Sequence, residues 1–164
     1  MQEKPAQTAV PIHELLAARW SPRALDPHRR LSPESIIALA EAARWAPSCF
    51  GDQPWRFVFC EREDTPRAWQ AAFEHLSANN QKWAGNAPLL IVTCTDPSFS
   101  NSGKANRWAE YDTGAAAENL VLQATALGLA AHQMGGFEPE GLAGALGVPD
   151  GVTLMSVIAV GHPA

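Results

Sequence analysis

Residues 46–55 read Ala-Pro-Ser-Cys-Phe-Gly-Asp-Gln-Pro-Trp, and this segment decides how the rest of the chain is interpreted. Pro47 and Pro54 restrict the backbone near its two ends, and the residues between them offer backbone amides, a hydroxyl and a side-chain amide. Such groups suit a flat ligand with polar edges. The alternative interpretation is an ordinary connection between a helix and a strand.

The composition around this segment is that of one ordinary domain. The chain has 164 residues, 46% of them hydrophobic, which is enough to bury a core. Twelve Lys and Arg against seventeen Asp and Glu give a net charge of −5, and the basic residues form no stripe of the kind that binds nucleic acid. The longest apolar runs have the length of a strand, not of a membrane span. We therefore expect neither a nucleic-acid partner nor a membrane partner.

The N-terminal residues and the cysteines favour a cytoplasmic protein without a metal. Residues 1–11 are polar, are expected to be flexible and lack the apolar centre of a secretory signal. Cys49, Cys60 and Cys94 are too few and too widely spaced for a disulfide framework or a zinc site. The five histidines have no spacing typical of metal ligands on a helix.

Hydrophobic spacing and helix-start signals predict the elements on either side of residues 46–55. A short helix around residues 12–16 ends before Ser21-Pro22. Ser32-Pro33-Glu34 starts a second helix, which must end before Pro47. After the segment we expect a strand over 55–60, a helix from Pro66 to about Ala78, a polar link over 79–83 and a central strand over 89–95.

One apolar helix dominates the second half of the chain. Asp112 is its expected N-cap, and its apolar residues run around the whole helix, so it must be buried in the centre of the domain or at a subunit interface. Before it, residues 96–107 are expected to form a mobile loop, either near a functional site or simply on the surface. After it we expect a short segment over 130–134, a helix from Glu138-Pro139 to Gly147 and a strand over 153–160.

Four motifs occur along the chain in an order that is specific when they are taken together. They are Arg19-Trp20-Ser21-Pro22-Arg23, the segment 46–55, Asn80-Gln81-Lys82-Trp83 before Ala87-Pro88, and Gln133-Met134-Gly135-Gly136-Phe137. With the elements between them, they make residues 12–162 resemble the nitroreductase family of FMN-dependent NAD(P)H oxidoreductases.

The resemblance implies an α+β, nitroreductase-like fold with a central, mainly antiparallel sheet flanked by helices. Residues 12–164 would form a single FMN-binding domain, and the long buried helix would lie at a dimer interface. The family's active sites are built across a homodimer, so each site would be shared between two subunits.

The resemblance also assigns residues to the cofactor, and each assignment has a plainer alternative. The arginines of the first motif and Ser21 would hold the FMN phosphate, ribityl chain and pyrimidine edge, but they are otherwise solvated turn residues. Asn80 would bond the flavin ring or simply form a turn, and the paired glycines would bring backbone N–H groups to flavin N5 and O4 or form a plain turn. The implied cofactor contacts are Arg19, Trp20, Ser21, Arg23, Pro47, Ser48, Cys49, Gly51, Asn80, Gln133, Met134, Gly135 and Gly136.

The function implied is hydride or electron transfer from NADH or NADPH through FMN to nitroaromatics, quinones or related electrophiles, by a ping-pong mechanism. Because the flavin supplies the chemistry, no catalytic side chain is expected. Phe50, Trp83 and Trp108 would offer stacking surfaces or serve as packing residues. The alternatives are an FMN-binding protein of the same fold without turnover, and a degenerate dimer without a cofactor.

The chain departs from the family pattern at four places. Gly51 stands where an Asn is usual, and Gly135 stands where Glu is frequent. The family's basic segment after the last strand has no counterpart before Ala164, so we expect weaker phosphate binding and either a truncated or a reduced member. Cys49 is either a small packing residue or a reactive thiolate.

Overall fold

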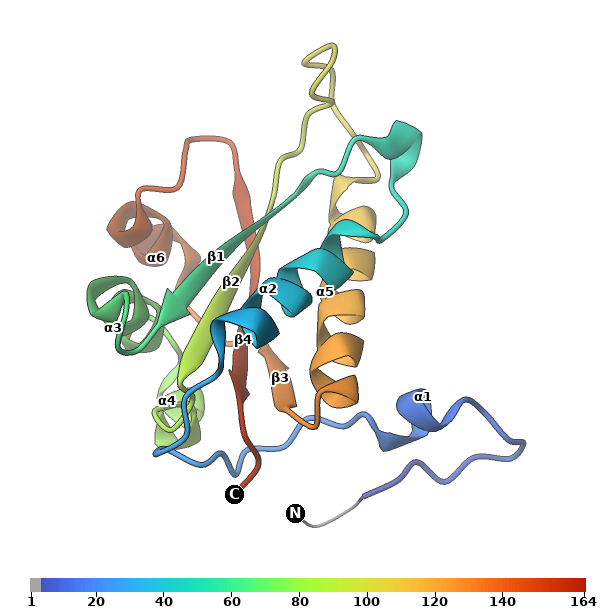
Figure 1. The fold of residues 1–164 in the computed structure, drawn as a ribbon. Coiled ribbons are helices and arrows are strands. Elements are labelled where there is room, and N and C mark those ends of the chain that lie inside the picture. The colour runs from blue at the N-terminus through green and yellow to red at the C-terminus, as the bar shows by residue number, and fades with distance from the viewer. Residues whose placement is uncertain (1–3) are drawn as a thin grey trace.

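Four antiparallel strands form the centre of the structure, a computed structural model that describes residues 4–164. They lie in the order β1-β2-β4-β3, as Figure 1 shows. Two helices cover each face of the sheet, and the prediction of an α+β fold with an antiparallel sheet is confirmed. The strands are β1 (Trp55–Glu61), β2 (Leu89–Thr95), β3 (Ala130–Met134) and β4 (Thr153–Gly161); α2 (Pro33–Arg44) and α5 (Ala109–Ala126) pack on one face, and α3 (Pro66–Glu74) and α6 (Pro139–Leu146) on the other.

Strand β2 is the central strand that its apolar sequence predicts. All seven of its residues are buried. Leu90 and Val92 face the layer of α3 and α6, whereas Leu89 and Ile91 face the layer of α2 and α5. This alternation follows from the two-residue period of a strand, and a strand covered on both faces has no polar side.

The predicted ends of two helices agree with the structure. The Ser32 hydroxyl accepts a hydrogen bond from the Ser35 amide at 3.2 Å at the start of α2, which ends at Arg44, before Pro47. The Glu138 carboxylate caps α6, and Gly147 ends it with a left-handed φ of 65°.

The predicted link over 79–83 and the predicted length of α3 are wrong. Residues Ala78–Ala84 form a further helix, α4, and α3 ends at Glu74. The Gln81 side-chain amide, on α4, donates to the carbonyls of Phe73, Glu74 and Leu76. It therefore supplies hydrogen-bond donors to free backbone carbonyls at the C-terminal end of α3. Hydrophobic spacing cannot reveal a cap supplied by a separate element.

The predicted N-cap of the apolar helix is also wrong. Helix α5 begins at Ala109 with Trp108 as its N-cap, and Asp112 lies in its first turn. The turn into the helix is made instead by Asn106, whose carbonyl accepts from the Ala109 amide and whose side-chain oxygen accepts from the Trp108 amide. The Asp112 carboxylate is therefore free to bond elsewhere.

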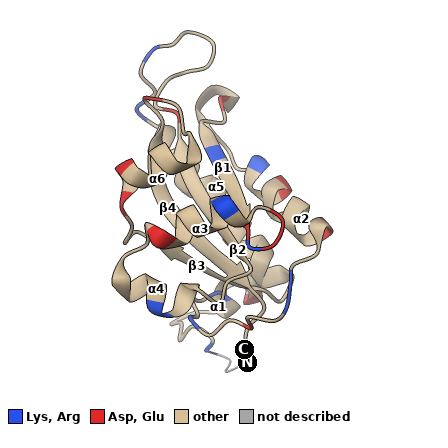
Figure 2. Cartoon of the chain, turned by 90° about the vertical axis from the view of Figure 1, so that its left-hand side faces the viewer, with Lys and Arg blue, Asp and Glu red and all other residues tan. Residues whose placement is uncertain are grey.

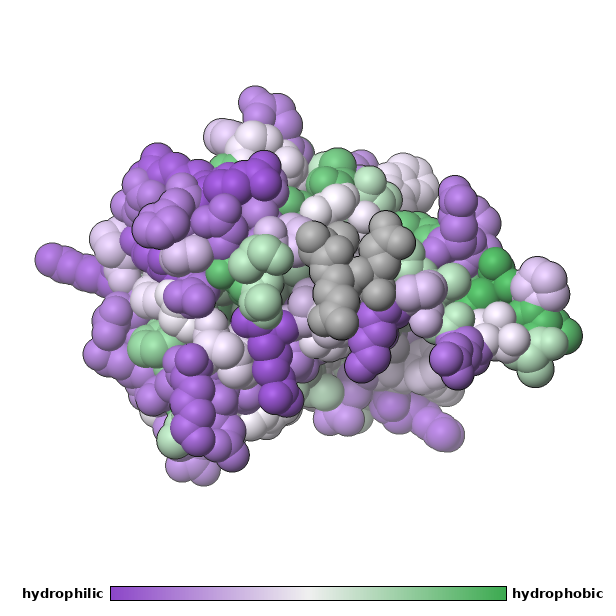
Figure 3. All heavy atoms as spheres, turned by 90° about the horizontal axis from the view of Figure 1, so that it is seen from below, coloured by the Kyte–Doolittle hydropathy of each residue, from purple (hydrophilic) through white to green (hydrophobic). Residues whose placement is uncertain are grey.

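Two segments project from the body of the molecule. Residues 96–107 form a hairpin-like excursion at the top of Figure 1, with an isolated bridge between Ser98 and Ala105 and further backbone hydrogen bonds such as that from the Phe99 amide to the Lys104 carbonyl. Helix α1 (Glu14–Ala18) extends at the lower right, and no residue of this helix is buried. Seen from below in Figure 3, apolar surface gathers on the projecting part at the right. The predicted flexible segment 1–11 lies partly outside the described residues.

Figure 2 shows lysine, arginine, aspartate and glutamate residues at scattered positions along the ribbon. Across residues 4–164, no helix is both long enough and apolar enough to cross a membrane.

Candidate active site

The residues assigned to the cofactor fall into two groups at opposite ends of the chain's fold. Segment 19–23, helix α4 and the residues after β3 lie in the lower half of Figure 1, and we call them the arginine group. Segment 46–55 lies at the upper right of the same view. A single chain therefore does not bring the two groups together.

Gly136 joins the arginine group to α4. Its carbonyl accepts hydrogen bonds from the Asn80 side-chain amide at 3.0 Å and from the Ser77 backbone amide at 2.9 Å. A Cβ at Gly136 would lie 2.9 Å from the Ser77 hydroxyl and 3.1 Å from the Asn80 side chain, whereas a Cβ at Gly135 would meet nothing within 4 Å. This close approach explains why residue 136 is a glycine. Because the Asn80 side chain uses its nitrogen to bond the Gly136 carbonyl, its side-chain oxygen takes no part in that hydrogen bond.

His132 fastens the arginine-bearing turn to the sheet. Its Nδ1 donates to the Pro22 carbonyl at 3.2 Å, and its ring lies 4.6 Å from the Trp83 ring. Burial lowers the pKa of His132, and the charges of Arg23 and Arg19 lower it further, against the bonds to backbone carbonyls, which raise it. The lowered pKa favours the neutral form of the histidine near neutral pH. Trp83 is a packing residue here.

The basic side chains of the turn remain available to solvent. Arg19 Nη1 lies 3.4 Å from the Ser21 hydroxyl, and Arg19 Nε lies 3.9 Å from Glu118. Ser21 and Arg23 are exposed, and none of the ion pairs in the described residues involves Arg23. Two guanidinium groups and a hydroxyl thus lie together at one end of the fold, a combination that favours an oxyanion such as phosphate.

The other predicted cofactor contacts of the arginine group differ in how far their side chains are exposed to a ligand. The Met134 side chain is only 2% exposed and belongs to the core, so only its backbone can reach a ligand. Gln133 is exposed. Trp20 is half-buried, with the Lys4 ammonium 5.8 Å from the centre of its ring.

Segment 46–55 has an unusual backbone. Phe50, Gly51 and Gln53 all have left-handed φ values, of 56°, 68° and 53°. Only glycine adopts this conformation without strain, so the two other residues must be held there. The Ser48 hydroxyl accepts from the Gln53 amide at 3.0 Å, and the Asp112 carboxylate of α5 accepts from the Cys49 amide at 2.9 Å.

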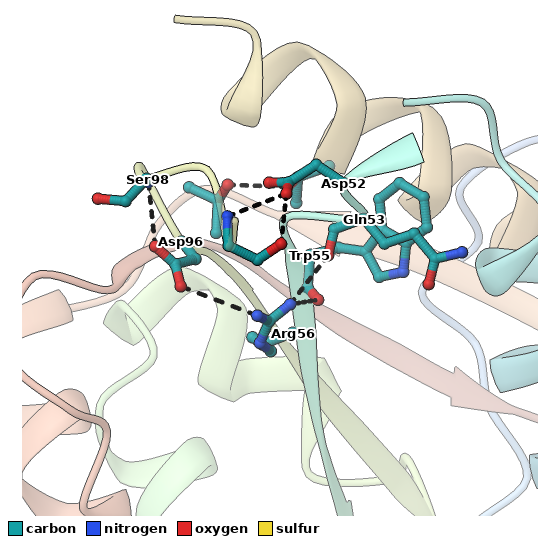
Figure 4. Close-up of polar contacts among 9 residues, drawn as sticks. Asp52, Gln53, Trp55, Arg56, Asp96 and Ser98 are labelled. Carbon is teal, nitrogen blue, oxygen red and sulfur yellow. Dashed lines mark hydrogen bonds and ion pairs between the residues drawn. The ribbon is translucent and has the colours of Figure 1, made fainter. Parts of the chain in front are cut away.

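A second set of contacts ties segment 46–55 to residues 96–107, as Figure 4 shows. The Asp52 carboxylate accepts from the Ser100 amide at 3.0 Å and from its hydroxyl at 2.6 Å, and these bonds lower the pKa of Asp52. Arg56 donates to the carbonyls of Gln53 and Trp55 and lies 3.8 Å from the Asp96 carboxylate. Phe50 is 88% exposed beside this junction.

The comparisons with known proteins identify the family. Residues 16–162 match the model described as the nitroreductase family. The chain belongs to this family. The prediction of a nitroreductase-family oxidoreductase is thereby confirmed.

Individual relatives agree with the family assignment. The chain is 31% identical over 139 residues to a protein of Archaeoglobus fulgidus provisionally named NADH dehydrogenase/NAD(P)H nitroreductase, covering 82% of this chain and 76% of that protein. A crystal structure described as an oxidoreductase containing FMN is 33% identical, with a TM-score of 0.91 over 100% of this chain and 83% of its own. A provisional nitroreductase from Desulfovibrio desulfuricans, in complex with FMN, is 28% identical, with a TM-score of 0.76 over 96% and 88%.

The three thiols of this nitroreductase-family chain differ in burial. Burial raises the pKa of Cys60 to about 12 and that of Cys94 to about 11, so both are unreactive near neutral pH. Cys49 is half-buried and lies within segment 46–55. Whether it is a packing residue or a reactive thiolate stays a prediction.

Sequence reasoning missed three residues that shape the site. The sequence shows His132 only as a histidine without metal-ligand spacing, gives no signal for Ser77, and predicts a helix cap at Asp112. Each acts on a residue far away in the sequence, for example across 110 positions for His132 and 63 for Asp112. The acid in a helical first turn was the one available signal, and it pointed to the wrong partner.

The paired glycines allow a matched stability test. Gly136→Ala places a methyl group 2.9 Å from the Ser77 hydroxyl, and we expect this overpacking to lower the free energy of unfolding by about 1–3 kcal/mol. Gly135→Ala, which meets open space, should change it by less than about 0.5 kcal/mol. Urea unfolding of both variants measures the difference, and equal losses would contradict the packing argument.

The lowered pKa of His132 predicts an acid-sensitive contribution to stability. Because the folded-state pKa lies below the unfolded value of 6.5, this contribution is complete above pH 6.5 and is lost as the pH falls through the folded pKa. In His132→Gln, the loss of unfolding free energy between pH 7.5 and pH 5 should be smaller than in the parent chain. Urea unfolding at the two pH values tests this, and parallel losses in both proteins would refute it.

Proposed function

We propose that this chain is an FMN-dependent NAD(P)H oxidoreductase that passes electrons to nitroaromatics, quinones or related electrophiles. The observation that carries the proposal is the group of half-buried Arg19 and exposed Ser21 and Arg23, whose turn is bonded to β3 through Pro22 and His132, in a chain of this family. The crystal structure described as containing FMN supports the choice of cofactor, and the relative's NADH dehydrogenase/NAD(P)H nitroreductase name supports the choice of donor.

The chemistry of the donor groups fits FMN. The guanidinium groups and the hydroxyl of the 19–23 turn suit a dianionic phosphate, and Asn80 and the glycine amides suit the polar edge of a flat ring. When bound, FMN supplies the hydride and electron transfer between the NAD(P)H donor and the acceptor. The chain's own residues would bind and orient the cofactor and leave one face of it accessible, so no catalytic side chain is required.

We further infer that two copies of the chain share each site. Segment 46–55 lies far from the arginine group within one chain, so a second copy would have to bring it there. Large aromatic side chains are exposed just after α2, in segment 46–55 and at the start of α5, where Trp45, Phe50 and Tyr111 are exposed by 72%, 88% and 80%. Exposed aromatic residues of this kind favour a protein interface.

The projecting N-terminal part supports the same arrangement. Val10, Ile12 and Leu16 are all exposed around α1, which has no buried residue. A helix of five residues with no fully buried side chain is poorly stabilised by its own chain. A second copy that covers α1 would supply the missing packing. We treat residues 12–164 as one FMN-binding domain of such a homodimer.

The colour of the purified protein tests the function. We expect a yellow protein that is bleached by NADH or NADPH and recoloured by a nitroaromatic or a quinone, followed by absorbance near the flavin band. Yellow protein that NAD(P)H does not bleach would favour a non-catalytic FMN-binding protein of the same fold. Colourless protein that takes up no added FMN would contradict both functions.

Mixed dimers test whether the sites are shared. Arg19→Ala and Ser48→Ala homodimers should both bind FMN more weakly, because each variant damages both sites. In a mixed dimer of shared sites, one site carries both changes and the other carries neither, so about half of the parental FMN binding should return. Sites built within single chains would show no recovery. Arg67→Ala, an exposed arginine on α3, is the control.

A further inference from the structure

Asp112 occupies a position that a carboxylate rarely takes. It is 5% exposed, and among the described residues it is the only charged side chain that is buried. A buried charge is costly unless it is paired or hydrogen-bonded. Its Oδ2 accepts a hydrogen bond of 2.9 Å from the Cys49 backbone amide, and its place in the first turn of α5 also favours negative charge.

Segment 46–55, which Asp112 contacts, has a strained backbone that other contacts must stabilise. Phe50 and Gln53 have left-handed backbones although neither is a glycine. Of the other contacts, the Ser48 bond to Gln53 stays within the segment, the Asp52 bond reaches Ser100 on the projecting excursion, and the Arg56 bond to the Gln53 carbonyl holds only the end of the segment next to β1. Asp112 instead connects the segment to α5, which packs against α2 and three strands of the sheet.

We propose that Asp112 is a positioning residue that holds segment 46–55 in the shape in which it meets the cofactor. This inference rests on the proposed function. Cys49 lies directly after Ser48 and two residues before Gly51, so fixing its amide also fixes the Ser48 hydroxyl and the backbone around Gly51. A charge-assisted hydrogen bond from a partly buried amide is among the stronger single hydrogen bonds in a protein. Its loss should leave the fold intact and let the segment leave its strained conformation.

Two substitutions separate the hydrogen bond from the packing. Asp112→Leu has a similar size and no acceptor, whereas Asp112→Asn keeps a neutral acceptor oxygen. The first readout is the rate at which iodoacetamide alkylates Cys49 in the cofactor-free protein, followed by mass spectrometry. Cys60 and Cys94 are fully buried, so they report global unfolding within the same sample.

We expect Asp112→Leu to raise the alkylation rate of Cys49 about tenfold, with Cys60 and Cys94 still protected. Asp112→Asn should stay within about threefold of the parent chain. An unchanged alkylation rate of Cys49 in Asp112→Leu would overturn the proposal, because segment 46–55 would then not depend on Asp112. An equal rise at all three cysteines would also overturn it, because the whole fold would then depend on Asp112.

The second readout is the dissociation constant of FMN, measured by quenching of flavin fluorescence. It should rise about tenfold in Asp112→Leu and return to within about threefold of the parent value in Asp112→Asn. Faster alkylation of Cys49 with unchanged FMN affinity would overturn the positioning role. If the parent chain bound no FMN, the proposed function would fail, while the alkylation rates would still decide whether Asp112 holds the segment.

Discussion

The burial of β2 on both faces is the constraint on which the rest of the structure depends. Seven consecutive buried residues require a helical layer on each side and a paired strand on each edge. Because Trp55 pairs with Thr95 and Thr95 with Thr153, the pairing also decides where the connecting segments leave the sheet. Segments 46–55 and 96–107 therefore leave at the same end, which is why Asp52 meets Ser100.

The two layers position different parts of the candidate site. On one face, α5 is packed against the sheet and presents Asp112 to segment 46–55. On the other, α4 meets the turn after β3 through Asn80 and Gly136. The rigid sheet keeps these parts at a distance from each other within one chain.

The charges of the site are arranged so that none is buried without a partner. Arg19 and Arg23 stay in contact with solvent, and the neighbouring His132 is kept neutral by burial and by these two cations. The one buried carboxylate has a backbone donor. The turn over residues 19–23 carries solvent-accessible positive charge and is bonded to the neutral His132. Such a turn suits an anionic group, and binding that group would require little rearrangement of the turn.

The sequence by itself determined three of the four strands, most of the helices, the family and the four motifs, because these depend on short-range periodicity and on local signals such as Pro33 and Gly147. The sequence did not predict α4 or the start of α5. Gln81 caps the end of α3 and Asn106 makes the turn into α5, both through side-chain hydrogen bonds that hydrophobic spacing does not encode. Only the tertiary structure decided that Asp112 bonds Cys49 and that His132 bonds Pro22. Those contacts join residues far apart in the chain, and their partners are set by the packing of the sheet and its layers.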